Sequence, residues 1–421
     1  MNLYLSKPGV MSCAGNNIEE VWKAVTSGNQ NGIKKVTACN GEEYYAARIS
    51  DSVLKPSGAR YDMKVVRIEN EALEQIAAGV EAVKAKYGAD RIAVCVGSCD
   101  NGTEFSVAAH RAYFAEGSFP ADYNLEIQGA DYASTMVAEK FALTGPVNTF
   151  STACSSSAGA IIKGAELILS GLADAAIVGG IDIASDTTLV GFSALEAVSS
   201  EITNPLSKNR HGITLGDGAA FFLLTREPLP QVLSTSQTGS ESTASSTPSI
   251  RLLGWGESSD AYHMTSPDPS GAGAEKAIRR ALESAGLSAS DVGYINLHGT
   301  GTKLNDSMES KAVAAIFGEN SVPVSTTKAV TGHTLGAAAA LEAAICWKTL
   351  VENHAKNIDN RTLPLQVWDG VKDDELPSLN IVDKNNKGQS GSTAAATEEL
   401  KVCLSNSFAF GGANACLALG I

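Results

Sequence analysis

The stretch NTFSTACSSSAGAIIKGAELILSGL, residues 148–172, decides how the rest of this sequence is interpreted. A short extended segment runs up to Ala153 and Cys154, and a helix rich in small residues follows it. Apolar residues recur at helical spacing in that helix, and Gly171 stands where a left-handed glycine commonly ends one. The pattern predicts a strand, a turn and a helix, with Cys154 at the helix N-terminus. Because the helix dipole stabilises an anion there, we expect the Cys154 thiol to lose its proton more easily than an ordinary thiol.

The composition of the chain excludes several classes of protein. It has 421 residues, 44% of them hydrophobic, which is enough for a large α/β core. No apolar run reaches the roughly 18 residues that span a bilayer, and the N-terminus does not have the pattern of a signal peptide. A net charge of −14 argues against nucleic acid or an anionic membrane as partner. The eight cysteines have no metal-type spacing, so we expect reduced thiols and a cytoplasmic protein.

Strand-like and helix-like segments alternate along the chain, which predicts an α/β fold. Two serine- and threonine-rich stretches, residues 228–250 and 387–399, predict mobile insertions, and one long helical pattern covers residues 62–87. The stretch around Cys154 has a counterpart in TGHTLGAAAALEAAICW, residues 331–347, where a strand again meets a polar turn and a small-residue helix. We therefore expect an internal duplication, with an N-terminal half at 1–250 and a C-terminal half at 251–421.

Two histidines stand in glycine- and threonine-rich turns of the second half. His298 lies in NLHGTGT, and His333 lies in TTKAVTGHTLGAA, five residues after Lys328. Reactive groups gather where strands end at one edge of an α/β sheet, so we expect both histidines close to Cys154. The residues alone leave open a cysteine hydrolase, a zinc site, and acyl transfer followed by carbon–carbon bond formation. The wide spacing of the donors disfavours zinc.

Four motifs, TACSSSAG, NLHGTGT, TTKAVTGHTLGAA and NSFAFGGANA, stand in an order and spacing that resembles the β-ketoacyl-acyl-carrier-protein synthases, in particular the Cys-His-His condensing type. The loop NPLSKNRHGITLGDGAA is also similar to a loop of this family, and the resemblance covers nearly the whole chain. It implies a duplicated thiolase-like α/β fold of five layers, αβαβα. A thiolase itself would need a second reactive cysteine in a pattern that Cys416 does not fit, and a non-catalytic partner subunit would usually lack the nucleophile.

The resemblance implies a decarboxylative Claisen condensation of an acyl thioester with malonyl-acyl-carrier protein in fatty-acid biosynthesis. The alternative is a specialised polyketide or aryl-polyene ketosynthase that works as a heterodimer with a chain-length-factor-like partner. Either enzyme would take substrates carried on the phosphopantetheine of acyl carrier protein and would need no metal, nicotinamide or flavin. A homodimer is expected, and a heterodimer with a related subunit stays open.

The resemblance also implies roles for individual residues. Cys154 would be the nucleophile, and His298 and His333 would promote decarboxylation and hold the enolate oxygen. Lys328 would tune the electrostatics of the site, with Glu309 as its carboxylate partner and Asp306 beside it.

The same resemblance implies the groups that bind the substrate. Thr300 and Thr302 would bond the phosphopantetheine arm, and the backbone N–H groups of Cys154 and Phe410 would form an oxyanion hole. Three aromatic residues would line or gate the acyl pocket: Phe192, Phe408 and Phe410. His211 stands where the family commonly has Asp, and such departures leave the acyl chain open.

Overall fold

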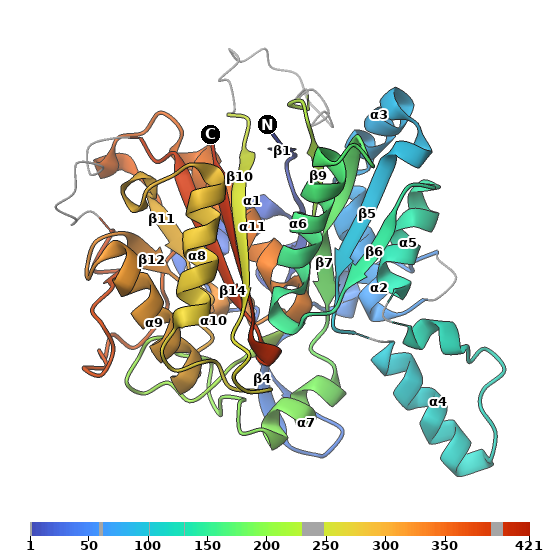
Figure 1. The fold of residues 1–421 in the computed structure, drawn as a ribbon. Helices are drawn as coiled ribbons and strands as arrows, with labels where there is room; N and C mark the ends of the chain where they lie inside the picture. The colour runs from blue at the N-terminus through green and yellow to red at the C-terminus, as the bar shows by residue number, and fades with distance from the viewer. Residues whose placement is uncertain (1, 59–61, 101, 130, 230–247, 389–398) are drawn as a thin grey trace.

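The computed structural model describes residues 2–58, 62–100, 102–129, 131–229, 248–388 and 399–421 (Figure 1). Most of the two predicted insertions, residues 230–247 and 389–398, lies outside these ranges. The strands are β1 (Tyr4–Leu5), β2 (Gly9–Ser12), β3 (Lys34–Thr37), β4 (Glu43–Ala47), β5 (Ile92–Gly97), β6 (Val147–Phe150), β7 (Ala175–Asp182), β8 (Leu215–Gly216), β9 (Gly218–Thr225), β10 (Arg251–Ser259), β11 (Tyr294–Asn296), β12 (Pro323–Ser325), β13 (Asn380–Ile381), β14 (Val402–Phe408) and β15 (Ala413–Gly420). The α-helices are α1 (Ile18–Ser27), α2 (Lys64–Glu74), α3 (Ala77–Tyr87), α4 (Thr103–Glu116), α5 (Tyr132–Phe141), α6 (Ser156–Leu169), α7 (Asp186–Ala194), α8 (Ala272–Ala285), α9 (Lys303–Phe317), α10 (Lys328–Thr331) and α11 (Ala338–Asn353).

The large sheet repeats one strand pattern twice. In the first half, β5 lies between its parallel partners β6 and β7, and β9 runs antiparallel to β7. In the second half, β11 lies between its parallel partners β12 and β14, and β15 runs antiparallel to β14. The short β1 pairs antiparallel with both β9 and β10 and so joins the halves. The repeated pattern agrees with the predicted duplication, whereas the exact boundary at residue 250 stays a prediction.

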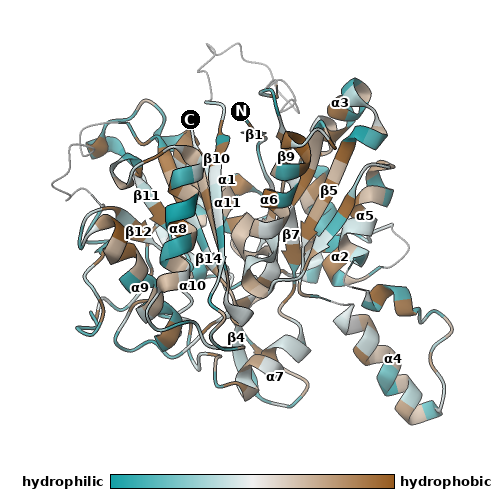
Figure 2. Ribbon diagram, in the orientation of Figure 1, coloured by the Kyte–Doolittle hydropathy of each residue, from teal (hydrophilic) through white to brown (hydrophobic). Residues whose placement is uncertain are grey.

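The helices and the two half-sheets form the five predicted layers. Helices α2, α3 and α5 pack on one face of the first half-sheet, and α8 packs on β10 and β15 of the second. Helices α6 and α11 contact each other between the halves, α6 lying on β5 and β7 and α11 on β14. Figure 2 shows the corresponding hydropathy, with apolar residues along β5 and hydrophilic turns on the outer side of α8. In the part of the chain that the structure describes, no helix is long and apolar enough to cross a membrane.

The helical pattern over residues 62–87 is two helices rather than the single one predicted. Helix α2 ends at Glu74, and α3 begins at Ala77. Between them, the side chain of Gln75 bonds to both backbone groups of Val10, accepting from its N–H at 3.2 Å and donating to its carbonyl at 3.0 Å. This tertiary contact with β2 sets the break, and the period of apolar residues alone could not show it.

Two glycines, Gly97 at the end of β5 and Gly164 within α6, let helix α6 approach the sheet closely. A Cβ on Gly164 would lie 2.2 Å from Cγ1 of Val178 in β7, and one on Gly97 would lie 2.3 Å from the backbone nitrogen of Ser157. Because neither contact leaves space for a methyl group, the first turn of α6 rests directly on the end of β5. The residue Cys154 is thereby held over the carboxyl end of the sheet.

We predict that Gly97→Ala lowers the free energy of unfolding by about 1–3 kcal/mol, since the added methyl group meets backbone that cannot turn away. Urea denaturation followed by circular dichroism measures the change. Gly191→Ala in helix α7 is the matched control, because no atom lies within 4 Å of its added Cβ. Gly97→Ala as stable as the wild type would contradict the packing described above.

Candidate active site

Two equivalent turns, one from each half, face each other at the centre of the molecule. The 3₁₀ turn Ala153–Ser155 carries Cys154 and leads into α6, and the turn Leu335–Ala337 follows His333 and leads into α11. Both turns begin with a non-glycine residue in the left-handed region, Ala153 at φ 51° and Leu335 at φ 50°. Such backbone strain persists only where the surrounding structure holds it, and it concentrates at functional sites. The duplication thus brings together two constrained turns with reactive side chains.

The structure brings Cys154 and the two histidines into one cluster. Nε2 of His333 lies 3.0 Å from Sγ of Cys154, and one donor atom from each of Cys154, His298 and His333 lies within 4.8 Å of the other two. The two imidazole rings stand nearly perpendicular, at 85°, with centroids 5.3 Å apart. All three side chains are buried.

Hydrogen bonds on the far side of each ring fix its tautomer. The backbone N–H of Leu335 donates to Nδ1 of His333 at 3.2 Å, and the Lys328 ammonium donates to Nδ1 of His298 at 3.5 Å. Burial lowers the pKa of both histidines well below the usual value, and the charge of Lys328 lowers it further. Both rings are therefore neutral with the proton on Nε2, which makes each a hydrogen-bond donor toward the cavity.

The same tautomers bear on the zinc alternative. A thiol and two ring nitrogens are a donor set that zinc accepts, but each nitrogen must offer its lone pair. Here the lone pair of each ring is on Nδ1, where it accepts a hydrogen bond from Leu335 or Lys328. The protons on Nε2 suit an anionic oxygen, and the nearby ammonium of Lys328 suits it as well.

The prediction that Glu309 is the partner of Lys328 is wrong. Nζ of Lys328 forms a hydrogen-bonded ion pair with Oε1 of Glu342, in helix α11. Glu309 instead accepts the backbone N–H groups of His298 at 2.8 Å and Gly299 at 2.7 Å. It therefore holds the His298 turn in place from α9. Burial raises the pKa of both Glu309 and Glu342 to about 7, and Lys328 opposes this effect at Glu342.

The expected lowering of the Cys154 pKa is also wrong. Burial raises the pKa of this thiol to about 12, while Lys328 and a hydrogen bond from the backbone N–H of Phe410 act in the opposite direction. The physical reason is that the side chain is only 7% exposed, so its thiolate would lose most of its hydration. Lys328, the Phe410 N–H and the helix N-terminus stabilise the thiolate of Cys154 and so offset part of the hydration that it loses on burial.

A cavity of about 490 Å³ opens over Cys154 and the two histidines. Its walls include all five residues predicted to bind substrate: Phe192, Thr300, Thr302, Phe408 and Phe410. The hydroxyls of Thr300 and Thr302 lie 3.0 Å apart, and the rings of Phe192 and Phe410 lie 5.7 Å apart, centroid to centroid. His211 lines the same cavity. The lining of the cavity thus includes both aromatic rings and hydroxyl groups.

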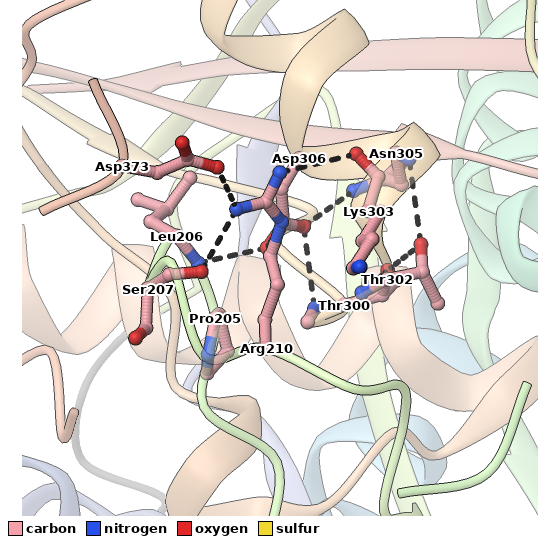
Figure 3. A network of polar contacts seen from close by, with 12 residues as sticks. Pro205, Leu206, Ser207, Arg210, Thr300, Thr302, Lys303, Asn305, Asp306 and Asp373 are labelled. Carbon is pink, nitrogen blue, oxygen red and sulfur yellow. Dashed lines mark hydrogen bonds and ion pairs between the residues drawn. The ribbon is translucent and has the colours of Figure 1, made fainter. Parts of the chain in front are cut away.

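Asp306 lies in a buried polar network that includes the Thr300–Thr302 turn, drawn in Figure 3. Its carboxylate accepts the backbone N–H of Leu206 at 2.8 Å and of Gly301 at 3.2 Å. The buried Arg210 lies 3.9 Å from the same carboxylate and donates to Asp373 at 2.5 Å. Asp306 thus ties the Thr300–Thr302 turn to the loop that follows Asn204. Sequence reasoning missed Arg210, although an arginine in a glycine-rich loop with acidic partners is a usable signal.

A cysteine facing two neutral imidazole N–H donors, on a duplicated thiolase-like fold, defines a condensing enzyme that transfers acyl groups. Residues 9–228 match the family model described as beta-ketoacyl synthase, N-terminal domain, and residues 250–359 match beta-ketoacyl synthase, C-terminal domain. The chain therefore belongs to the beta-ketoacyl synthase family.

Individual relatives agree with this assignment. The chain is 31% identical to 3-oxoacyl-[acyl-carrier-protein] synthase 2 of Coxiella burnetii, over 98% of this chain and 96% of the relative. It is 30% identical to the synthase of the same name from Vibrio cholerae, over 97% and 96%. Among solved structures, it is similar to a chain of the complex of the ketosynthase ApeO with its chain length factor ApeC from Xenorhabdus doucetiae, with TM-score 0.82, 37% identity, and 100% and 98% of the two chains covered. It is also similar to the ishigamide ketosynthase/chain length factor, with TM-score 0.81, 25% identity, and 100% and 98% covered.

We predict that alkylation of Cys154 by iodoacetamide accelerates about tenfold per pH unit between about pH 7 and pH 9, without a plateau. The raised pKa of Cys154 means that its thiolate fraction keeps growing with pH over this range. Mass spectrometry of the Cys154 peptide measures the rate, and the exposed Cys39 serves as internal reference. A plateau below pH 8 would show a lowered pKa instead.

We predict that Lys328→Met slows the same alkylation by about tenfold or more at a fixed pH, since the loss of a nearby positive charge raises the pKa of Cys154 further. Lys303→Met is the matched control, because Lys303 is an exposed lysine that lines the same cavity. Equal rates in the two variants would show that Lys328 does not act on the thiol through its charge.

Proposed function

We propose that this protein catalyses the decarboxylative condensation of an acyl thioester with malonyl-acyl-carrier protein, which gives a β-ketoacyl-acyl-carrier protein. The single observation that carries the proposal is the contact of 3.0 Å between Sγ of Cys154 and Nε2 of His333, with the ring of His298 beside it. A nucleophile and two N–H donors around one cavity suit a reaction that builds negative charge on a thioester oxygen. Family membership supports the same reaction.

In the first step, Sγ of Cys154 attacks the carbonyl carbon of the acyl thioester. As the carbon–sulfur bond to the phosphopantetheine arm breaks, the proton lost by the Cys154 thiol is taken up by the sulfur of the arm, which leaves as a thiol. The backbone N–H of Phe410 already points at Sγ, so together with the N–H of Cys154 it is placed to hold the carbonyl oxygen. The acyl group ends as a thioester of Cys154.

In the second step, the malonyl group loses carbon dioxide and leaves an enolate. Nε2–H of His298 and of His333 donate to the enolate oxygen, and these bonds are stronger to the enolate than to the neutral thioester. The enolate carbon then attacks the acyl carbonyl, the bond to Sγ breaks, and a β-ketoacyl product leaves on the carrier. Because both rings stay neutral, neither holds the malonyl carboxylate as an ion pair.

The arm that carries the substrates is the phosphopantetheine of acyl carrier protein. The hydroxyls of Thr300 and Thr302 lie in the cavity wall, where they can bond the amide groups of such an arm. No further cofactor takes part in these steps. We place the reaction in the cytoplasm, in agreement with eight free cysteines.

A second candidate is a polyene or polyketide ketosynthase that works with a related subunit. The 37% identity to the complex of ApeO and ApeC exceeds the 31% identity to the Coxiella synthase. Among the described strands, β6 lies at the edge of the large sheet, and α4 with the loop after it exposes Phe114 at 83% and Leu125 at 70%. Exposed apolar groups and an edge strand are both features that favour association with a second subunit, identical or related.

We predict that the purified chain, given an acyl-carrier protein charged with an acyl group and malonyl-acyl-carrier protein, forms a product extended by two carbons. Cys154→Ala abolishes it, and His298→Ala or His333→Ala lowers its rate by about a hundredfold or more, since each removes one donor to the enolate oxygen. Mass spectrometry of the intact carrier measures the product.

The outcomes of this assay separate the candidates. Condensation by the chain alone supports the fatty-acid enzyme, and condensation only after co-expression with a chain-length-factor-like subunit supports the second candidate. Hydrolysis of the acyl thioester without use of malonyl-acyl-carrier protein would refute both.

A further inference from the structure

The buried carboxylate of Asp182, at the end of β7, lies between the two halves of the active site. Its Oδ1 accepts the Ser98 hydroxyl at 3.0 Å and the backbone N–H groups of Cys99 at 3.0 Å and Asp100 at 2.9 Å. Its Oδ2 accepts the backbone N–H of Gly336 at 2.5 Å. The first three donors belong to the loop after β5 in the first half, and Gly336 belongs to the turn after His333 in the second. The proposed mechanism gives Asp182 no part.

One side of this carboxylate reaches the Cys154 turn through Cys99. Sγ of Cys99 donates to the carbonyl of Ala153 at 3.4 Å and lies 3.6 Å from Oγ of Ser156. Oγ of Ser156 in turn accepts the backbone N–H of Thr152 at 2.9 Å. These contacts surround Ala153, whose backbone is in the left-handed region. The loop of residues 98–100, which Asp182 binds, therefore also stabilises the strained turn that carries Cys154.

The other side reaches His333 through Gly336. Leu335, whose N–H fixes the tautomer of His333, directly precedes Gly336 in the same turn. A Cβ on Gly336 would lie 2.6 Å from Oδ2 of Asp182 and 3.0 Å from the backbone nitrogen of Cys99. The two halves therefore meet at this point with no room for a side chain, and the carboxylate is the group that fills the junction.

We propose that Asp182 is a positioning residue that sets the distance and orientation between Cys154 and His333 by clamping the turns of both halves to one carboxylate. It does not touch substrate. A carboxylate suits this role because it accepts several N–H and O–H donors at once, as Asp182 does from the loop after β5 and from Gly336. This inference rests on the proposed function for the measurement of condensation, whereas the measurement of the His333 tautomer does not depend on it.

Asp182→Asn is the sharpest test, because the amide keeps the size of the side chain but has a single acceptor oxygen. We expect the amide oxygen to face residues 98–100, because more donors lie on that side. The NH₂ group then faces the backbone N–H of Gly336. Repulsion between these two donors loosens the turn that holds His333. We expect kcat for condensation to fall about tenfold to a hundredfold, with KM for the acyl-carrier protein changed less than about threefold.

A spectroscopic measurement separates this role from general destabilisation. In protein labelled with ¹⁵N-histidine, we expect the wild-type His333 signal, assigned by its loss in His333→Ala, to report a proton on Nε2. Asp182→Asn is expected to give mixed tautomers at His333, and to leave the circular dichroism spectrum unchanged. Glu69→Gln is the control, because Glu69 is an equally buried carboxyl on α2 outside the catalytic cavity, and we expect neither kcat nor the spectrum to change.

An unchanged kcat and an unchanged His333 tautomer in folded Asp182→Asn would overturn the proposal. If Asp182→Asn does not fold, Cys99→Ala is the variant to test. It removes only the contacts of the Cys99 thiol with Ala153 and Ser156. We expect that variant to lower kcat by about threefold or more with His333 unaltered, and full activity would overturn the proposal. A wild type that condenses no substrate would refute the proposed function, while the tautomer of His333 would still test the role of Asp182.

Discussion

The close approach of the two turns at residues 153–155 and 335–337 is the constraint on which the rest of the site depends. Each turn leads into a small-residue helix, and the two helices lie side by side between the half-sheets. A Cβ on Gly180 would lie 2.7 Å from Cβ of Ser157 and 3.1 Å from the carbonyl oxygen of Gly336, so even a methyl group would separate the halves. The short contact between Cys154 and His333 is thus a consequence of backbone packing. The side chains of Cys154 and His333 determine the chemistry of this contact, and the glycines allow the backbones to come close enough to form it.

Lys328 organises the electrostatics inside that geometry. Its ammonium adds to the effect of burial in lowering the pKa of both imidazoles, acts against the raised pKa of Cys154, and is itself held by Glu342. A buried ion pair of this kind contributes little net stability, because desolvation of both charges offsets their attraction. Its value is therefore functional, since one fixed cation acts on the pKa of three neighbouring groups at once. A lysine at this position without Glu342 would be a buried, unpaired charge.

Sequence patterns were sufficient to predict that Cys154, His298 and His333 lie together, because each stands in a turn after a strand, and parallel strands end at a common edge. They were also sufficient for the α/β class and the duplication. They could not choose between Glu309 and Glu342, because both carboxylates lie on helices and only the packing of α9 and α11 decides which one faces Lys328. The single charge within the apolar run AAAALEAAICW was a signal for Glu342. The prediction of a lowered pKa for Cys154 was wrong for a related reason. The sequence shows that Cys154 stands at a helix N-terminus, but it does not show how deeply the side chain is buried.

The turns that carry the reactive side chains and the α7 wall of the cavity are different parts of this fold. The side chains that we propose to be catalytic lie on turns whose backbone donates hydrogen bonds to buried carboxylates, as His298 does to Glu309 and Gly336 to Asp182. Part of the cavity wall comes from α7 and the residues after it, where only Leu189 of the helix is buried and Leu195 is 54% exposed. Substitutions in that wall can change the shape of the cavity without moving a catalytic atom. A common condensing mechanism can therefore serve different acyl chains on one fold, because the residues of the α7 wall are not those that hold Cys154, His298 and His333 in place.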